Sequence, residues 1–185
     1  MTAATAYHRQ PQSASRDDRV LARYYRTAFA WPASADSTGV WLRLGGDVDV
    51  LAIRVGLAVK VNSILVQSLL SAPVIEVRGH HTLWVFLTQS RTSLRQSTWA
   101  DLVRLGIGWR EPGSLLRLPA LCDITSSFRW LKCPTRGVRL PPWTAVVGAA
   151  RSASSQSQTV HHGQQRQADK SCEVCLLSRI LSCHG

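Results

Sequence analysis

The pattern of apolar and polar positions predicts a helix followed by strands in the first part of the chain. From Asp17 to Ala28 the apolar residues fall at helical spacing, and the acidic start suits the positive end of a helix dipole. Trp31-Pro32 ends this pattern, and residues 33–39 are predicted to form a loop. Two strands are predicted next, at residues 39–44 and 48–55, with Gly-Gly as the turn that leads from one to the other.

The rest of the chain continues to switch between helical and strand patterns. Helical spacing covers residues 58–70 and 92–105, and Pro73 and Gly106 stop these two patterns. Further strands are predicted at residues 73–79, 81–89, 113–119 and 128–134. The first two of these form a predicted hairpin whose turn carries both histidines of Gly79-His80-His81. The prolines of residues 134–146 predict a winding finish.

This order of elements predicts one folded domain between two polar ends. Residues 1–16 contain little to bury and are expected to be disordered. Residues 17–150 form the predicted domain, an α/β (α+β) fold with a two-layer mixed sheet and flanking helices. Residues 151–185 are low in complexity and are expected to be mostly disordered, with room for a short helix.

The charge balance bears on partners rather than on the fold. The chain carries 22 Lys and Arg against 11 Asp and Glu, a formal net charge of +11, and 19 of the 22 cations are Arg. Such a balance favours nucleic acid, a nucleoside triphosphate or another polyanion as the partner. An Arg-rich, Lys-poor composition is also what a GC-rich genome produces, so the charge alone leaves the partner open.

The lack of a recognisable targeting signal and the pattern of cysteines predict a cytoplasmic protein. No run approaches the roughly 18 apolar residues that a membrane span needs, so no membrane contact is expected. The N-terminus has no compact apolar segment of the kind found in secretory signals. Five cysteines without a regular framework fit reduced thiols better than a disulfide scaffold.

The stretch GGDVDVLAIRVG, residues 45–56, decides whether the sequence predicts an enzyme. Asp47 and Asp49 are two residues apart, and on an extended chain both carboxylates point to the same face, where they could hold a divalent metal. The same letters also describe a polar turn that leads into a buried strand. In that alternative both carboxylates are solvated and have no chemical role.

Three blocks of sequence carry a resemblance to a known family. The run GSLLRLPALCDITSSFRWLKCPTRGVRLPPW resembles the C-terminal part of bifunctional DNA primase/polymerase (prim-pol) domains of the archaeo-eukaryotic primase superfamily. Upstream, EVRGHHTLWVFL is similar to the family's hairpin with a histidine, and GGDVDVLAIRV lies where an apolar strand ending in acid-x-acid is expected. The resemblance covers about residues 38–146. It implies a two-layer fold with an RRM-like half and an ancestry in templated nucleotide transfer.

The resemblance also implies a site. In such enzymes three acids bind two divalent metals, Mg or Mn, that align the 3′-hydroxyl with the triphosphate, and a histidine and basic residues hold the phosphates. His81 then corresponds to the family histidine, and Asp47 and Asp49 to two acids. The remaining candidates for phosphate or nucleic-acid binding are Arg78, His80, Arg110, Arg117 and Arg129. Without the resemblance, His80 and His81 are typical of a solvated turn.

A second register of the first block replaces the acids. If the apolar run VDVLAIRV aligns with the family strand, then Ala52 and Arg54 occupy the acid positions. The third acid is expected near Ile107-Gly108-Trp109, where none exists, and Glu111 is the nearest carboxylate. We prefer this register, because the family acids follow a full apolar strand. It predicts a degenerate domain, since phosphoryl transfer depends on the metals.

Two other groups of residues have chemical interpretations. The strand patterns place Trp41, Trp84 and Trp130 in the core, whereas Trp109 in a Gly-rich turn is the candidate for base stacking. At the C-terminus a short metal-ligand spacing could bind zinc, although an amphipathic helical end with incidental thiols is the preferred interpretation. Its potential ligands are Cys172, Cys175, Cys183 and His184.

Three functions therefore remain open. The leading hypothesis is a prim-pol-like domain that has lost catalysis and binds nucleic acid or nucleotide without a cofactor. The second is an active metal-dependent nucleotidyltransferase that uses Asp47 and Asp49, with Glu111 as the third acid and Mg or Mn as cofactor. The third is a scaffold or regulatory interaction protein in which an exposed aromatic strand serves as an oligomer interface.

Overall fold

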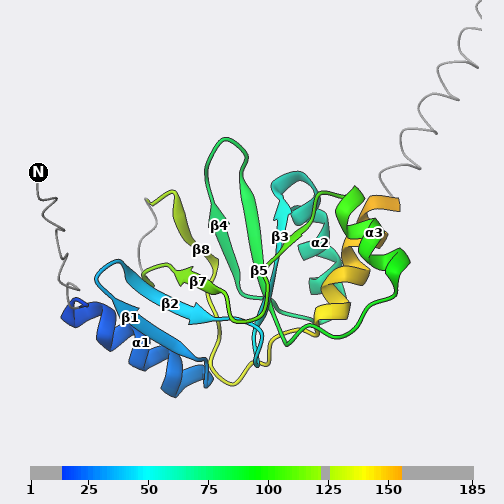
Figure 1. Ribbon diagram of the computed structural model, residues 1–185. Coiled ribbons are helices and arrows are strands. Elements are labelled where there is room, and N and C mark those ends of the chain that lie inside the picture. Colours follow the sequence, from blue (N-terminus) through cyan, green and yellow to red (C-terminus); the bar gives the residue numbers. More distant parts are fainter. Residues whose placement is uncertain (1–13, 122–125, 156–185) are drawn as a thin grey trace, which may run out of the picture.

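Eight strands and four helical segments make up the part of the chain that the computed structural model describes, residues 14–121 and 126–155. Figure 1 shows their arrangement. The helices are α1 (Arg16–Phe29), α2 (Val55–Gln67), α3 (Gln96–Arg104) and the helical residues 143–155. The strands are β1 (Ala33–Asp36), β2 (Gly39–Arg43), β3 (Asp49–Arg54), β4 (Val74–Val77), β5 (Leu83–Thr88), β6 (Gly108–Trp109), β7 (Leu115–Leu118) and β8 (Phe128–Lys132).

The strands form two sheets, and every pair within them is antiparallel. The larger sheet has the order β6-β3-β5-β4-β8 and the smaller one the order β1-β2-β7. The predicted α+β class is confirmed, but the prediction of a mixed sheet is wrong. Strands β3 and β4 do run in the same direction, yet β5 inserts between them and pairs antiparallel with both.

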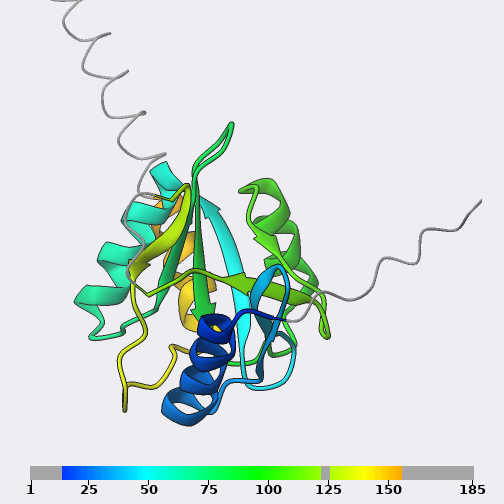
Figure 2. The same cartoon turned by 90° about the vertical axis from the view of Figure 1, so that its left-hand side faces the viewer.

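Part of the chain has the element order and strand order of an RRM-like half. The elements β3-α2-β4-β5-α3-β6 follow the β-α-β-β-α-β order, and their strands lie in the sheet as β6-β3-β5-β4. The helices α2 and α3 and the helical residues 143–155 pack together on one face of this sheet, at the right of Figure 1. The β4–β5 hairpin projects beyond the neighbouring strands in both Figure 1 and Figure 2.

Two hydrophobic cores lie on opposite faces of the larger sheet. On β3, Leu51 and Ile53 face the helices, whereas Val50 faces the smaller sheet and α1. Because both faces of β3 are covered, its sequence is a nearly continuous apolar run rather than an alternating one. The second core is rich in aromatic rings, since Tyr25 of α1 stacks on Trp31 with ring centroids 5.7 Å apart.

Helix α1 begins and packs as its sequence predicts. The Ser15 side chain caps it by accepting the Asp18 backbone N–H at 3.0 Å, and Asp17 and Asp18 occupy its first turn. Its buried side carries Ala22 and Tyr25. The helix ends at Phe29, where Ala30 adopts the left-handed conformation of a C-cap.

Three predicted elements differ from the structure. Residues 33–36 form β1 instead of a loop, because they pair with β2, and the short Ala-Ser-Ala-Asp alternation was too small a signal to predict a strand. The two-residue strand β6 was not expected. The predicted winding finish is instead helical from residue 143, with Trp143, Val146 and Ala150 buried.

The helical residues continue to 155, so the predicted domain boundary at 150 falls inside a helix, and Ala153 is buried beyond it. Disorder was predicted for residues 1–16, but Ser15 caps α1 and Arg16 begins it, so the end of that range is ordered. Residues 1–13 and 156–185, with the potential zinc ligands Cys172, Cys175, Cys183 and His184, lie outside the described residues. Among the helices of the described ranges, none combines the length and apolar character that crossing a bilayer requires.

Candidate functional site

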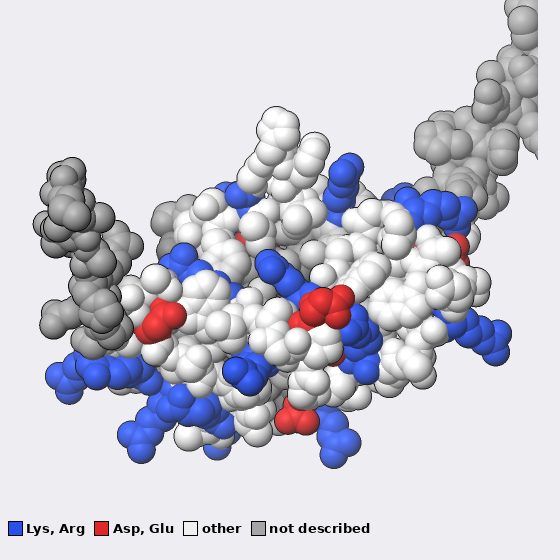
Figure 3. Space-filling view, viewed as in Figure 1, with Lys and Arg blue, Asp and Glu red and all other residues white. Residues whose placement is uncertain are grey.

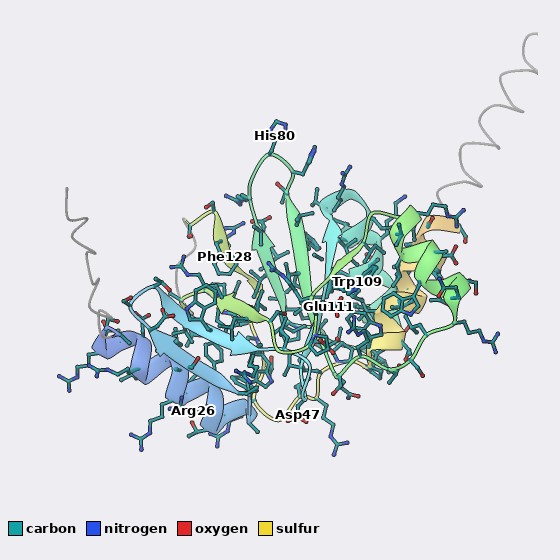
Figure 4. The ribbon with its side chains drawn as sticks, viewed as in Figure 1. Arg26, Asp47, His80, Trp109, Glu111 and Phe128 are labelled. Atoms are coloured by element: carbon teal, nitrogen blue, oxygen red, sulfur yellow. The ribbon has the colours of Figure 1, made fainter. Side chains whose placement is uncertain are left out.

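The turn of the β4–β5 hairpin presents both histidines to solvent. His80 and His81 are exposed, and their rings lie 5.2 Å apart. His80 is at the very tip of the hairpin (Figure 4). The predicted hairpin with histidines in its turn is therefore confirmed, while the phosphate-binding role of His81 stays a prediction.

Two of the predicted phosphate-binding arginines meet at one carboxylate. The Nε atom of Arg78 lies 2.9 Å from Oε2 of Glu76, and that of Arg129 lies 2.8 Å from the same oxygen. Strands β4 and β8 bring them together, since Glu76 lies opposite Arg129 in the sheet. Glu76 is only 8% exposed. Desolvation raises the pKa of Glu76, but the hydrogen bond from Arg129 and the charges of both arginines outweigh it and lower the pKa below its ordinary value.

This cluster carries less free positive charge than the sequence suggests. Two guanidinium groups share one carboxylate, so the three side chains have a net charge of +1. A phosphate that approached Arg78 or Arg129 would compete with Glu76 for the same donors. The cluster therefore mainly links β4 to β8, and only part of its positive charge is available to a ligand.

Arg110 and Arg117 stand on other elements. Arg110 is exposed directly after β6, and Arg117 is exposed on β7 of the smaller sheet, opposite Trp41 of β2. Among the predicted phosphate-binding residues, Arg78 and Arg129 meet at Glu76, and the rings of His80 and His81 lie side by side. Arg110 and Arg117 form no ion pair within residues 14–121 and 126–155.

The stretch GGDVDV forms a bend that leads into a buried strand. Gly45 has a φ of +92°, a left-handed conformation that suits glycine. Its N–H donates to the carbonyl of Val48 at 3.0 Å, and the carbonyl of the preceding Leu44 accepts the N–H of Gly113 at 2.8 Å. The bend is thus held against the loop that follows β6.

The bend separates the environments of the two aspartates. Asp47 is exposed at the rim of a cleft of about 460 Å³ between the end of α1 and residues 133–140 (Figure 4). Asp49 is 3% exposed, and its Oδ2 accepts the backbone N–H of Arg91 at 2.7 Å. Side chains two residues apart point to the same face only where the chain is extended, and the extended chain begins only at Asp49.

The alternative third acid is also engaged by Arg91. The Nη2 atom of Arg91 lies 3.5 Å from Oε2 of Glu111, and its guanidinium lies 5.6 Å from the ring centroid of Trp99. Arg91 therefore contacts Asp49 through its backbone and Glu111 through its side chain. Across the described ranges, no three His, Cys, Asp or Glu side chains gather as a metal site would require.

Trp109 lies in a small cleft on the helix side of the larger sheet. Its ring centroid is 4.8 Å from that of Trp99, with the planes tilted by 55°. The cleft measures about 440 Å³ and is lined by Arg91, Thr92, Ser93, Trp99, Trp109 and Glu111. Trp130 is buried as predicted, whereas Trp41 and Trp84 are only partly buried.

In the second register, a substituted position lies next to the place expected for the third acid. Ala52 of β3 lies opposite Gly108 of β6, and a Cβ atom placed on Gly108 would lie 3.6 Å from the Cβ of Ala52. Arg54 is exposed at the end of the same strand. Alanine and glycine offer no ligand atom, and a guanidinium repels a cation. In this register the residues do not fit a two-metal site.

Sequence reasoning missed Arg91, Trp99 and the acceptor role of Glu76. Their contacts cross between distant segments, and no local motif marks them. Comparison of the chain with protein-family models, with curated proteins and with solved structures finds no match.

Proposed function

We infer that this chain binds nucleic acid through arginine side chains, without a metal ion and without transferring nucleotides. The observation that carries this proposal is the pairing of Ala52 with Gly108, with Arg54 at the end of the same strand. Three acids that share two metals have to converge. Ala52, one of the two substituted positions of the second register, lies opposite Gly108, near which the third acid was expected, and this supports a degenerate prim-pol-like domain.

The chemistry of Arg54 supports binding rather than catalysis. A guanidinium is always charged and presents donors that match a phosphate, so an arginine in place of a metal-binding acid could contact the phosphate directly. The alternative acids Asp49 and Glu111 each contact Arg91, and a metal would have to displace that arginine from Glu111. An active nucleotidyltransferase is therefore the weaker proposal.

The composition supports the same partner. A net charge of +11 with 19 arginines favours a polyanion, and phosphate contacts release condensed counterions from nucleic acid. The cytoplasm is the compartment that fits this partner and the reduced-thiol interpretation of the cysteines, of which Cys133 is exposed.

The proposal is tested by fluorescence anisotropy with the full chain and a labelled 20-nucleotide single-stranded DNA. We expect binding that weakens linearly on a log–log scale as salt is raised, and that is unchanged by EDTA. Incubation with manganese, a primed template and deoxynucleoside triphosphates should give no incorporation.

Two results would contradict it. Undetectable or salt-insensitive binding would favour the scaffold hypothesis. Metal-dependent incorporation that Asp47→Asn abolishes would instead favour the enzyme. Asp47→Asn is the informative variant here, because Asp47 is exposed, whereas changing the buried Asp49 also removes a partner of the Arg91 backbone.

A further inference from the structure

Four arginines form a row along one side of α1. They are spaced by three, four and three residues, which places them on the same side of a helix. The row consists of Arg16, Arg19, Arg23 and Arg26. Together with Ser34 and Ala35 of β1 these arginines line an open groove of about 870 Å³. Figure 3 shows basic side chains gathered at the lower left, where α1 lies in Figure 1.

The positive charge of this row is not neutralised within residues 14–121 and 126–155. There, Arg16, Arg19 and Arg23 form no ion pair. Arg26 has a structural contact, since its Nη1 donates to the carbonyl of Ala33 at 2.8 Å. The nearby carboxylate of Asp18 accepts the hydroxyl of Ser15 at 2.6 Å.

We propose that this arginine row is a docking surface for the phosphodiester backbone of nucleic acid, an inference that rests on the proposed function. Ten residues of helix separate its ends, which corresponds to about 15 Å. That length spans several consecutive phosphates of a nucleic-acid strand. Arginine forks bind phosphate oxygens in pairs, so the row can contact several consecutive phosphates without reading bases.

The packing of α1 favours nucleic acid over a membrane surface. Basic amphipathic helices can bind anionic bilayers, but they do so by inserting their apolar side. In α1 that side carries Ala22 and Tyr25, which are 1% and 0% exposed in the core of the protein. That side is already occupied, so the apolar residues of α1 still open to a bilayer are Val20 and Tyr24, which are 61% and 41% exposed.

The decisive experiment compares two double variants of the full chain that lose the same charge. Arg19→Gln/Arg23→Gln alters the row. Arg95→Gln/Arg104→Gln alters two exposed arginines, the N-cap and the last residue of α3, of which Arg104 pairs with Asp101; α3 lies at the other end of the molecule in Figure 1. Binding of the 20-nucleotide single-stranded DNA is measured over a range of salt concentrations. We expect the first variant to bind roughly tenfold more weakly near 0.1 M salt, with a log–log slope smaller by about 1.4, and the second to bind almost as the natural chain does.

A charge-preserving variant separates binding from folding. Arg19→Lys/Arg23→Lys should retain most of the affinity, and the thermal unfolding midpoints of all variants are measured alongside.

If the natural chain binds DNA but both Gln variants lose affinity equally, or neither does, the arginine row is not the docking surface and the proposed function still stands. If the natural chain does not bind DNA, both proposals fail. Binding to phosphatidylserine vesicles that depends on Arg19 and Arg23, without DNA binding, would assign the row to membranes and overturn the inference.

Discussion

A single hydroxyl group holds the aromatic core together across three distant segments. The hydroxyl of Tyr25 accepts the indole N–H of Trp130 at 3.0 Å and donates to the carbonyl of Pro119 at 3.5 Å. Burial raises the pKa of Tyr25 far above its ordinary value, although the hydrogen bond from Trp130 acts in the opposite direction. The group therefore stays neutral and acts as a hydrogen-bonding link.

Removing this hydroxyl should destabilise the protein. Tyr25→Phe leaves the buried N–H of Trp130 without its partner, so we expect a loss of about 1–3 kcal/mol in the free energy of unfolding. Urea denaturation of the full chain measures it. The neighbouring Tyr24 is 41% exposed, and Tyr24→Phe serves as the control with little effect. Equal effects of the two substitutions would show that the buried link has no special role.

Glu76 should make stability depend on pH in the acidic range. Its pKa is lowered in the folded protein from an ordinary value near 4.5, because the hydrogen bond from Arg129 and the two arginine charges outweigh desolvation. Its contribution is therefore present above about pH 4.5 and is lost as the pH falls through the lowered pKa. We expect the unfolding midpoint of Glu76→Gln to lie below that of the natural chain at pH 7 and to approach it in acid.

The control for this titration is Glu111→Gln, because the Glu111 side chain is 78% exposed. It should change the unfolding midpoint little at any pH. A gap between Glu76→Gln and the natural chain that stays constant from pH 7 to pH 3 would mean that ionisation of Glu76 does not contribute to stability.

At the scale of elements, the bend before β3 packs closely on the loop after β6. A Cβ atom on Gly45 would lie 2.5 Å from both Cα and Cβ of Pro112, in addition to the positive φ. Gly45→Ala should therefore cost at least about 1–3 kcal/mol in the free energy of unfolding. The adjacent Gly46 has no atom within 4 Å of such a Cβ, so Gly46→Ala should be nearly neutral in the same denaturation experiment. Similar costs at both positions would contradict the contact.

The pairing of β3 with β6 allows a direct test of the degenerate register. Ala52→Asp/Gly108→Asp places two carboxylates on neighbouring strands, so manganese should raise the unfolding midpoint of this variant and not that of the natural chain. The isosteric pair Ala52→Asn/Gly108→Asn should show no such rise. If manganese stabilises the natural chain equally, its own carboxylates bind the metal and the register with Asp47 and Asp49 gains support.

The sequence was informative for elements whose pattern is local. The β4–β5 hairpin was predictable because apolar strands flank Gly79 and the histidines, and the helix at 17–28 because its spacing and acidic start agree. The helical residues from 143 were missed although Trp143, Val146 and Ala150 are at helical spacing, because the preceding prolines suggested irregular structure. The site could be predicted less well: Arg129 reaches Glu76 over 53 residues of sequence, and no local signal announces that contact.

At the scale of the whole molecule, the larger sheet separates two faces with different characters. One face carries the core shared by α2, α3 and the helical residues 143–155, and the other carries the aromatic core under α1 and the smaller sheet. The arginine row on α1 belongs to the second side. The composition predicted a basic protein, and the packing of α1 adds that its four arginines stay exposed while Ala22 and Tyr25 are buried.

The order of strands in the smaller sheet has a consequence for how the protein is made. Strand β2 pairs with β7, and the entire RRM-like half lies between them in the chain. During synthesis the β1–β2 hairpin therefore emerges long before its second neighbour, and such distant pairing carries a large loop-closure entropy. Until the RRM-like half has folded and delivered β7, one edge of β2 stays open. That open edge offers the nascent chain a place to pair with another copy.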